Sequence, residues 1–511
     1  MIRISNIKVP LDGDIYEKVK KEIPGAKNVK ITKKSIDARK KSDVHYVYTV
    51  DLCADNELLL VKKNKNITLV EEYEYKFPKA PVNDIPYVVV GGGPAGLMCA
   101  YLLCENGHKV ILLERGKCVE ERKKDVDNFN ENGILDENSN VQFGEGGAGT
   151  FSDGKLTTGI KDFRIKKVLE VFVQNGAPEE ILYLSKPHIG TDNLYNMVRS
   201  MRNEIIKNGG DVRFRSIMTG FIIENGEIKG CIVNDDYTIK TNKIVLATGH
   251  SARDTFKMLK ESNVKMEQKS FSVGGRIEHS QEMINKSQYG EFYNKLGAAD
   301  YKLSAHLPDG RGVYTFCMCP GGYVMASASE KGGIVTNGMS YYARDGKNAN
   351  SALLVSVTPK DFGSDDVLAG MYLQREIEQR AYKAANNTYK APAQYVGDFL
   401  GVEITDKKVT PTYKMGVTWT NIHEVLPNFV VKAMREGIKE LDKRLKGFAS
   451  TGAVITVPET RSSSPVRILR DDTMQSNIKG LYPCGEGAGY AGGIMSAAVD
   501  GIRVAERIIG C

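Results

Sequence analysis

The clearest pattern of apolar positions lies in residues 87–114, where three segments follow one another. A short apolar run, "YVVV", leads into a glycine cluster, then into "GLMCAYLLC" with apolar residues at helical spacing, and finally into "KVILLE". Short apolar runs on either side of a helix are typical of strands buried in a parallel sheet. The pattern therefore predicts a strand–turn–helix–strand unit of a doubly wound α/β sheet.

Weaker patterns divide the rest of the chain. Residues 1–80 alternate between strands and a short helix, which predicts a small N-terminal α/β domain followed by a proline-containing linker. Residues 211–247 predict a meander of short strands, and the chain ends in a strand, a turn and one long helix. We expect a discontinuous Rossmann-like domain built from residues 85–260 and 456–511, with residues 261–455 inserted as a β-rich α+β substrate domain.

Composition and charge exclude several classes of protein. The 511-residue chain is 41% hydrophobic and 26% charged with a formal net charge of +7, which is ordinary for a globular protein. The basic excess in residues 1–80 does not form a stripe interleaved with aromatic residues, so it predicts a solvated face and argues against nucleic-acid binding. Nine cysteines without metal-ligand spacing predict a reducing, cytoplasmic environment and no metal site.

Neither the start of the chain nor its most apolar stretch predicts a membrane protein. The opening "MIRISNIKVP" lacks the apolar core of a secretory signal. Residues 88–104 are apolar, but their glycine cluster and the charges that soon follow favour a buried strand, turn and helix over a membrane span.

Three glycines in this unit have the spacing of a dinucleotide-binding turn. Gly91, Gly93 and Gly96 form G-x-G-x-x-G between the predicted strand and helix. The first glycine permits the tight turn, the second lets the backbone approach a pyrophosphate, and the third lets the helix pack on the strand. The helix N-terminus favours anionic phosphates. Glu114, at the end of the next strand, is predicted to accept hydrogen bonds from a ribose hydroxyl. The predicted site also includes Pro94, Ala95 and Arg115.

Two distant stretches resemble signatures of FAD enzymes with the glutathione-reductase type of fold. They are "KIVLATGH" and "CGEGAGYAGGIMSAAVDG". In that class, an acidic residue at the position of Glu486 holds the ribityl or pyrophosphate part, and a helix that begins near Gly493 directs its positive end at the flavin. The resemblance implies FAD, and because no second glycine motif follows a strand, any NAD(P)H would bind transiently. The other residues predicted to contact FAD are Gly147, Met218, Ala247, Thr248, Gly249, Gly485, Gly492 and Ile494.

Longer stretches resemble a bacterial family of uncharacterised FAD-dependent dehydrogenases or oxidoreductases. The resemblance extends from about residue 35 to the end of the chain, and it implies the fold and the cofactor described above but no substrate. The stretches that carry it are "SIDARKK", "NVQFGEGGAGTFSDGKLTT", "ATGHSARDTF", "TFCMCPGG", "ETRSSSPVRI" and "GEGAGYAGGIMSAA".

A second glycine cluster, "VQFGEGGAGTFSDGK", occupies residues 141–155. Because residues 91–96 already supply the pyrophosphate turn, we predict that this backbone lies beside the flat flavin ring. Lys155 at its end, and Arg461 in another stretch of small residues, are candidates for anchoring an anionic substrate in a cleft. For each of these two cations, an ordinary structural ion pair is the alternative.

Four further residues have two possible roles. His250 and Arg253 follow the "ATG" turn and are placed to face the active site, whereas the helix N-cap pattern of Ser251 with Asp254 favours a structural role for them. Cys317 and Cys319 alternate on a predicted strand and would share one face. They are either a redox pair or two buried apolar thiols, and an extended strand strains a disulfide between positions two apart.

The sequence thus predicts an FAD-dependent oxidoreductase that exchanges a hydride between the flavin and a small-molecule substrate with an anionic group. Two other functions stay open. One is a flavin-dependent RNA-modifying enzyme with the basic N-terminal unit as its docking module, and the other is an FAD-bearing sensor or interaction protein without turnover. The substrate, the electron donor and the oligomeric state are not predicted.

Overall fold

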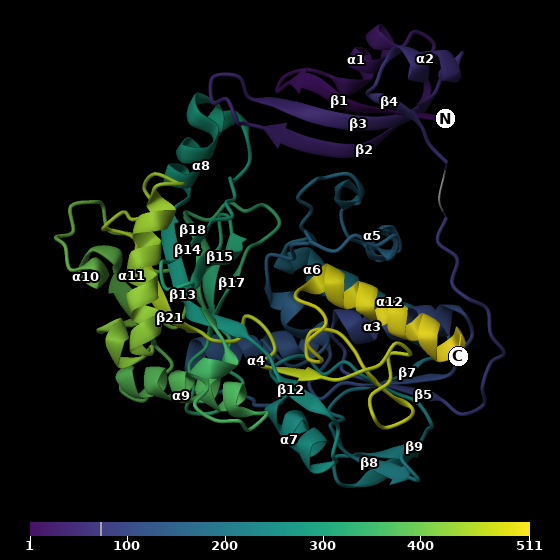
Figure 1. Cartoon of the computed structure of the whole chain (residues 1–511), viewed down its shortest axis with the longest axis vertical. Coiled ribbons are helices and arrows are strands. Elements are labelled where there is room, and N and C mark those ends of the chain that lie inside the picture. Colours follow the sequence, from purple (N-terminus) through teal and green to yellow (C-terminus); the bar gives the residue numbers. More distant parts are fainter. Residues whose placement is uncertain (72–73, 511) are drawn as a thin grey trace.

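The computed structural model describes residues 1–71 and 74–510 and shows a mixed α/β protein. A small sheet formed by the N-terminal residues lies at one end of the molecule, and two larger sheets with their helices make up the rest (Figure 1). Among the described residues, no helix has the length and apolar character needed to cross a membrane.

The N-terminal unit is a four-stranded antiparallel sheet in the order β2-β3-β1-β4. Its apolar residues form a core of their own between the sheet and the first helix, whose N-terminus is capped by Asp14. The edge strand β2 also bonds to the body of the protein, where Lys34 donates its backbone N–H to Tyr183 (2.7 Å) and accepts from Ser185 (2.9 Å). The elements are β1 (Ile2–Pro10), α1 (Ile15–Glu22), β2 (Lys27–Asp37), β3 (His45–Cys53), α2 (Glu57–Lys63) and β4 (Ile67–Leu69).

A protein that lacks the N-terminal unit should still bind FAD. A truncation that begins at Glu74 keeps Tyr75 and Phe77, which pack on the core beneath the predicted cofactor site. All residues of that site lie after residue 89, so we expect full flavin absorbance per chain relative to the whole protein. Soluble, folded but colourless truncated protein would contradict this expectation.

The predicted strand–turn–helix–strand unit forms the centre of a five-stranded parallel sheet in the order β23-β11-β5-β6-β7. Helix α3 is buried all round because it lies between this sheet, α6 and the C-terminal helix α12. The elements are β5 (Tyr87–Val90), α3 (Pro94–Glu105), β6 (Val110–Leu113), α4 (Val119–Asn132), α5 (Arg164–Gln174), α6 (Thr191–Lys207), β7 (Asp211–Arg213), β11 (Ile244–Leu246), α7 (Arg253–Glu261), β23 (Leu481–Pro483) and α12 (Ile494–Gly510).

A meander of three antiparallel strands lies between β7 and β11, as the turn pattern of residues 211–247 predicts. Its strands are β8 (Met218–Glu224), β9 (Glu227–Val233) and β10 (Tyr237–Lys240).

The second large sheet has seven strands in the order β14-β15-β18-β13-β21-β19-β20. Its largest core lies between the sheet and helices such as α9 and α11. Strands β16 (Tyr323–Ala326) and β17 (Thr336–Met339) lie in the same part of the chain but pair only with each other. The other elements are β13 (Phe271–Ser280), α8 (Gln281–Tyr289), β14 (Ser304–His306), β15 (Gly312–Cys319), β18 (Asn348–Val357), α9 (Ala369–Ala384), β19 (Ala391–Tyr395), α10 (Val396–Leu400), β20 (Val417–Trp419), α11 (Asn428–Asp442) and β21 (Val454–Glu459).

The two large sheets are joined by a short antiparallel pair, β12 (Met266–Gln268) with β22 (Val466–Ile468). The chain reaches the seven-stranded sheet after β12 and leaves it before β22. The predicted boundary at residue 456 falls inside β21, which pairs with β13 and β19 in the seven-stranded sheet. The chain therefore returns to the parallel sheet after residue 459.

Candidate cofactor and active-site cavity

A cavity of about 550 Å³ is bordered by the carboxyl ends of the parallel strands and by residues of β15 and β21 in the seven-stranded sheet. Its size is that of a small-molecule or cofactor site, and crevices beyond the carboxyl ends of parallel strands are where open α/β sheets bind ligands. The predicted site residues that border it are Gly91, Gly93, Pro94, Ala95, Glu114, Arg115, Gly147, Lys155, Met218, Ala247, Thr248, Gly249, Arg461, Glu486, Gly492, Gly493 and Ile494.

The three glycines of the first motif have different roles in the structure. A Cβ on Gly91, whose φ is +105°, would collide with the carbonyl oxygen of Ala247, and one on Gly96 with that of Gly91. Both glycines are required by the packing of the chain itself, and of the two only Gly91 also borders the cavity. A Cβ on Gly93 would meet only the Cα of Gly147, at 3.9 Å. The space beside Gly93 therefore belongs to the cavity and suits a ligand that lies close to the backbone.

Two helices begin at this cavity. Gly93 is the N-cap of α3, has no side chain to cap the first N–H groups, and is followed by Pro94. Uncapped N–H groups at a helix N-terminus favour a phosphate. The second helix, α12, begins after Gly492 and Gly493, at which a Cβ would meet no atom within 4 Å. Gly485 is the other predicted residue outside the cavity lining, and a Cβ there would lie 2.9 Å from that of Ala95.

The carboxylate of Glu114 joins the two glycine clusters. It accepts backbone N–H groups from Gly92 (2.6 Å), Gly116 (2.9 Å) and Gly144 (2.9 Å). A carboxylate has about four acceptor positions, so one is left for a ribose hydroxyl. The predicted ribose contact stays a prediction, and the structure adds a second role for Glu114, which is to hold the loop at residue 144 against the dinucleotide turn.

Arg122 holds the start of the glycine-rich segment 141–155 and accounts for its glycine at position 144, although no pattern in the sequence marks this arginine. Its fully buried guanidinium donates to four backbone carbonyls of the loop. A Cβ on Gly144 would collide with the Arg122 side chain, and one on Gly147 would lie 3.1 Å from the Cα of Gly93. In the sequence Arg122 stands in the charged helix "VEERKKDVDNF", where nothing separates it from a surface residue. The four carbonyls belong to Asn140 (2.8 Å), Val141 (3.0 Å), Glu145 (2.6 Å) and Gly147 (3.0 Å).

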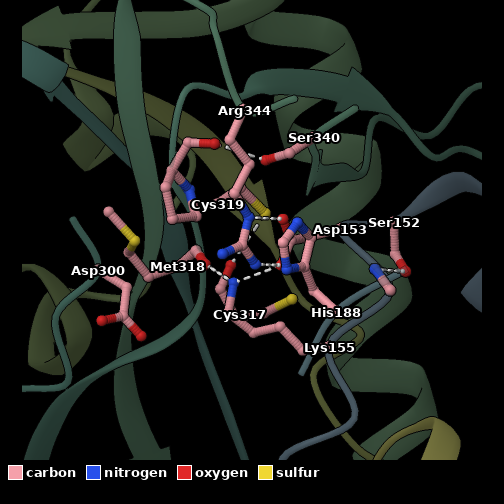
Figure 2. A network of polar contacts seen from close by, with 12 residues as sticks. Ser152, Asp153, Lys155, His188, Asp300, Cys317, Met318, Cys319, Ser340 and Arg344 are labelled. Carbon is pink, nitrogen blue, oxygen red and sulfur yellow. Dashed lines mark hydrogen bonds and ion pairs between the residues drawn. The ribbon is translucent and has the colours of Figure 1, made fainter. Parts of the chain in front are cut away.

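Lys155 both borders the cavity and forms an ion pair (Figure 2). Its ammonium lies 2.7 Å from the carboxylate of Asp153 and donates to the carbonyl of Met318. Asp153 is fully buried and is also paired with Arg344 at 2.6 Å. Burial alone would raise the pKa of Asp153, but Lys155 and Arg344 hold it at about 2. Lys155 thus forms the structural ion pair and also borders the cavity, and its role as a substrate anchor stays a prediction.

The guanidinium of Arg461 has the geometry of a structural ion pair. It donates to both carboxylate oxygens of Glu378 (3.0 and 2.9 Å) and to the hydroxyl of Ser329. Arg253 bonds to the same carboxylate (2.8 and 2.9 Å). All three charged groups are buried. Although burial opposes it, the two arginines hold the pKa of Glu378 at about 2. This network favours the structural alternative for Arg461.

Replacing Glu378 with Gln should destabilise the protein by about 3 kcal/mol, because it leaves the buried Arg461 without a bonded anion and leaves Arg253 paired with Glu330 alone. The measurement is urea unfolding of the FAD-bound protein. Glu376→Gln on the same helix is the matched control, because Glu376 forms only an exposed i,i+4 pair with Arg380. Equal unfolding midpoints for the two variants would contradict the assignment.

Two expectations near these residues are wrong. Helix α7 begins at Arg253 with Ala252 as its N-cap, so Ser251 does not cap it and instead donates to the Gln142 side chain at 3.0 Å. Cys317 and Cys319 do not alternate on a regular strand, because Cys317 has a φ of +41° and the pairing of β15 with β18 shifts register between Phe316 and Cys319.

Several titratable groups border the cavity. His250 faces it as predicted, and burial, followed by the nearby charge of Arg461, lowers its pKa to about 3, so the imidazole is neutral. Burial raises the pKa of Glu486 to about 7 despite the charge of Lys269. Burial also raises the pKa of Glu459 to about 7, although Arg276 lies 3.2 Å from its carboxylate. Among the described residues, no cluster of His, Cys, Asp and Glu side chains has a metal-binding arrangement.

Comparison with known proteins identifies related domains in three parts of the chain. Residues 270–462 match the model of the FAD-dependent protein, C-terminal domain-like family, and residues 89–119 match the NAD(P)-binding Rossmann-like domain. Residues 1–53 match a domain of unknown function.

Two curated proteins are similar in sequence. An uncharacterized protein of Clostridium beijerinckii is 47% identical over 99% of this chain and 98% of its own length. Thiamine thiazole synthase of Thermotoga maritima is 25% identical over 39% of this chain and 70% of its own length.

Among solved structures, L-proline dehydrogenase from P. horikoshii is similar to this chain, with 14% sequence identity and a TM-score of 0.32. The alignment covers 84% of this chain and 94% of that chain. Glycine oxidase from Bacillus cereus has 13% identity, covers 84% of this chain and 95% of that chain, and has a TM-score of 0.30.

Proposed function

We propose that this chain is an oxidoreductase that exchanges a hydride between FAD and a small-molecule substrate. The chain belongs to the same family as the uncharacterized protein of Clostridium beijerinckii. FAD is its cofactor. The substrate that we infer carries an anionic group, which binds beside Lys155. NAD(P)H, if it is a donor, binds transiently in the same cavity.

The observation that carries the proposal is that one cavity is bordered by both large sheets. Its walls include the dinucleotide turn at Gly93 and the start of α12 at Gly493, and also Phe316 and Cys317 from the seven-stranded sheet. FAD held by the dinucleotide turn and the start of α12 would meet, inside this cavity, a substrate held by the seven-stranded sheet. The isoalloxazine supplies the hydride chemistry when FAD is bound, and the protein supplies orientation and electrostatics.

The residues present fit FAD. The uncapped N-terminus of α3 and the open space at Gly93 suit the pyrophosphate, and Glu114 has a free acceptor position for the ribose. At the start of α12, the open space at Gly493 suits the flavin ring, whose negative charge on reduction is favoured by a helix N-terminus. This arrangement supports the glutathione-reductase type of binding that the sequence predicts.

At the substrate end, Lys155 supplies a fixed positive charge. Asp153 and the Met318 carbonyl hold its ammonium in place, so it needs little reorganisation to bind an anion. Glu459 borders the same cavity with a pKa raised by burial to about 7, which suits a group that gives or takes a proton at neutral pH. We infer that Lys155 orients the substrate and Glu459 holds the proton that accompanies its oxidation or reduction.

Anaerobic reduction of the purified yellow protein tests this proposal. The donors are NADH, NADPH and a panel of small carboxylates, each carboxylate paired with its uncharged methyl ester. We expect bleaching of the flavin by at least one carboxylate and a much slower reaction with its ester. If no donor reduces the flavin, the result would favour an FAD protein without turnover. Equal rates of flavin reduction by a carboxylate and its ester would contradict the anionic substrate.

A further inference from the structure

The segment Cys317–Met318–Cys319 leaves the regular strand geometry at the wall of the cavity. In a strand, two residues advance by about 6.6 Å, close to the limit of about 6.8 Å for the Cα atoms of a disulfide. The positive φ of Cys317 and the register shift after Phe316 break this extended path. A non-glycine residue in the left-handed region is a feature that concentrates at functional sites.

Hydrogen bonds from two cations and one thiol reach this segment, and Figure 2 shows the contact with Lys155. Arg276, which is fully buried, donates to the carbonyl of Cys317 at 2.8 Å and lies 3.6 Å from the sulfur of Cys319. Lys155 donates to the carbonyl of Met318. The thiol of Cys319 donates to the carbonyl of Cys317 at 3.3 Å. Both cysteines are thus fixed next to each other by the two cations nearest to them.

The two thiols have opposite electrostatic environments. A hydrogen bond from Cys319, with the charges of Lys155 and Arg276, lowers the pKa of Cys317 to about 6 although burial opposes it. The same hydrogen bond and burial raise the pKa of Cys319 far above its ordinary value. Of the two thiols, that of Cys317, which borders the cavity, is therefore the one that ionises more readily. By contrast, burial raises the pKa of Cys484, which also borders the cavity.

We propose that Cys317 and Cys319 are a redox-active dithiol that exchanges two electrons with the FAD bound in this cavity. In the oxidising direction the Sγ–Sγ bond forms, the S–H bond of Cys319 breaks, and the pair loses two electrons and one proton. Both electrons and the proton pass to oxidised FAD, which becomes the singly protonated reduced form. Cys317 is the sulfur that faces FAD, and Cys319 is the resolving partner. The proposal needs bound FAD, but it does not need the hydride exchange with a small substrate proposed above.

The test is an anaerobic dithionite titration of the FAD-bound protein after mild oxidation with diamide. We expect the wild type to take up four electrons per FAD, two for the flavin and two for the disulfide. Cys317→Ser and Cys319→Ser should each take up two and keep their yellow colour. The matched control is Cys484→Ser, a buried cysteine at the same cavity, which should take up four.

A second readout uses the wild type alone. In the diamide-treated protein, the tryptic peptide that holds both cysteines should be lighter by two hydrogen atoms and should resist alkylation until it is reduced. Two-electron uptake by the wild type, or alkylation of both cysteines without prior reduction, would overturn the proposal even if a serine variant fails to fold. If the wild type takes up four electrons per FAD but no metabolite of the donor panel reduces its flavin, the dithiol proposal stands and the proposed hydride exchange is contradicted.

Discussion

A Gly93→Val protein should purify as folded protein without its yellow colour. A Cβ at position 93 meets no protein atom closer than 3.9 Å, so the chain itself tolerates a side chain there. The two methyl groups of valine would occupy the space in which the pyrophosphate must approach the backbone. We expect FAD binding to weaken at least about 100-fold, or about 3 kcal/mol. The measurement is flavin absorbance per chain, followed by titration of the apoprotein with FAD.

Gly96→Val is the matched control for this prediction. A Cβ there collides with the carbonyl oxygen of Gly91, inside the protein and away from the ligand space. Overpacking of this kind should lower the free energy of unfolding by about 3 kcal/mol or more. A Gly93 variant with full flavin absorbance, or one that unfolds as the Gly96 variant does, would contradict the division of roles between the two glycines.

Lys155→Met should keep FAD and slow the reduction of the flavin by an anionic substrate about 100-fold, or about 3 kcal/mol, the effect typical of one preorganised charged donor. Methionine keeps the apolar stem, and Asp153 remains paired with Arg344 through two bonds, so the fold should persist. The measurement is stopped-flow reduction with whichever carboxylate of the panel reacts fastest.

Arg344→Met is the control, because Arg344 pairs with the same buried carboxylate but is not among the described residues that border the cavity. If Lys155 acts on the substrate, the Arg344 variant should reduce much faster than the Lys155 variant. Equal slowing would assign the effect to Asp153, and loss of FAD from the Lys155 variant would make the lysine a cofactor ligand.

The cofactor half of the cavity could be predicted because its signals are local. Glycine spacing, an acidic residue at a strand end and the start of a helix are all readable within one stretch of sequence. The structure brings these stretches together in one cavity and separates Gly96 and Gly485, which serve packing, from the glycines that border the ligand space.

The substrate half could not be predicted because its contacts join distant residues. Arg122 and Arg276 look like ordinary charged residues in the sequence, yet each is fully buried and holds backbone that borders the cavity. Arg461 looks like a cleft cation, but its guanidinium is bonded to Glu378, 83 positions away. The bulge at Cys317 depends on its register against β18, which no local pattern indicates.

A crystal structure of the yellow protein would show whether FAD and substrate share one cavity between the two large sheets. We expect one FAD per chain, with its pyrophosphate at the N-terminus of α3 beside Gly93 and its isoalloxazine toward Lys155 and Cys317. An isoalloxazine that points away from the seven-stranded sheet, or FAD bound outside this cavity, would contradict this expectation.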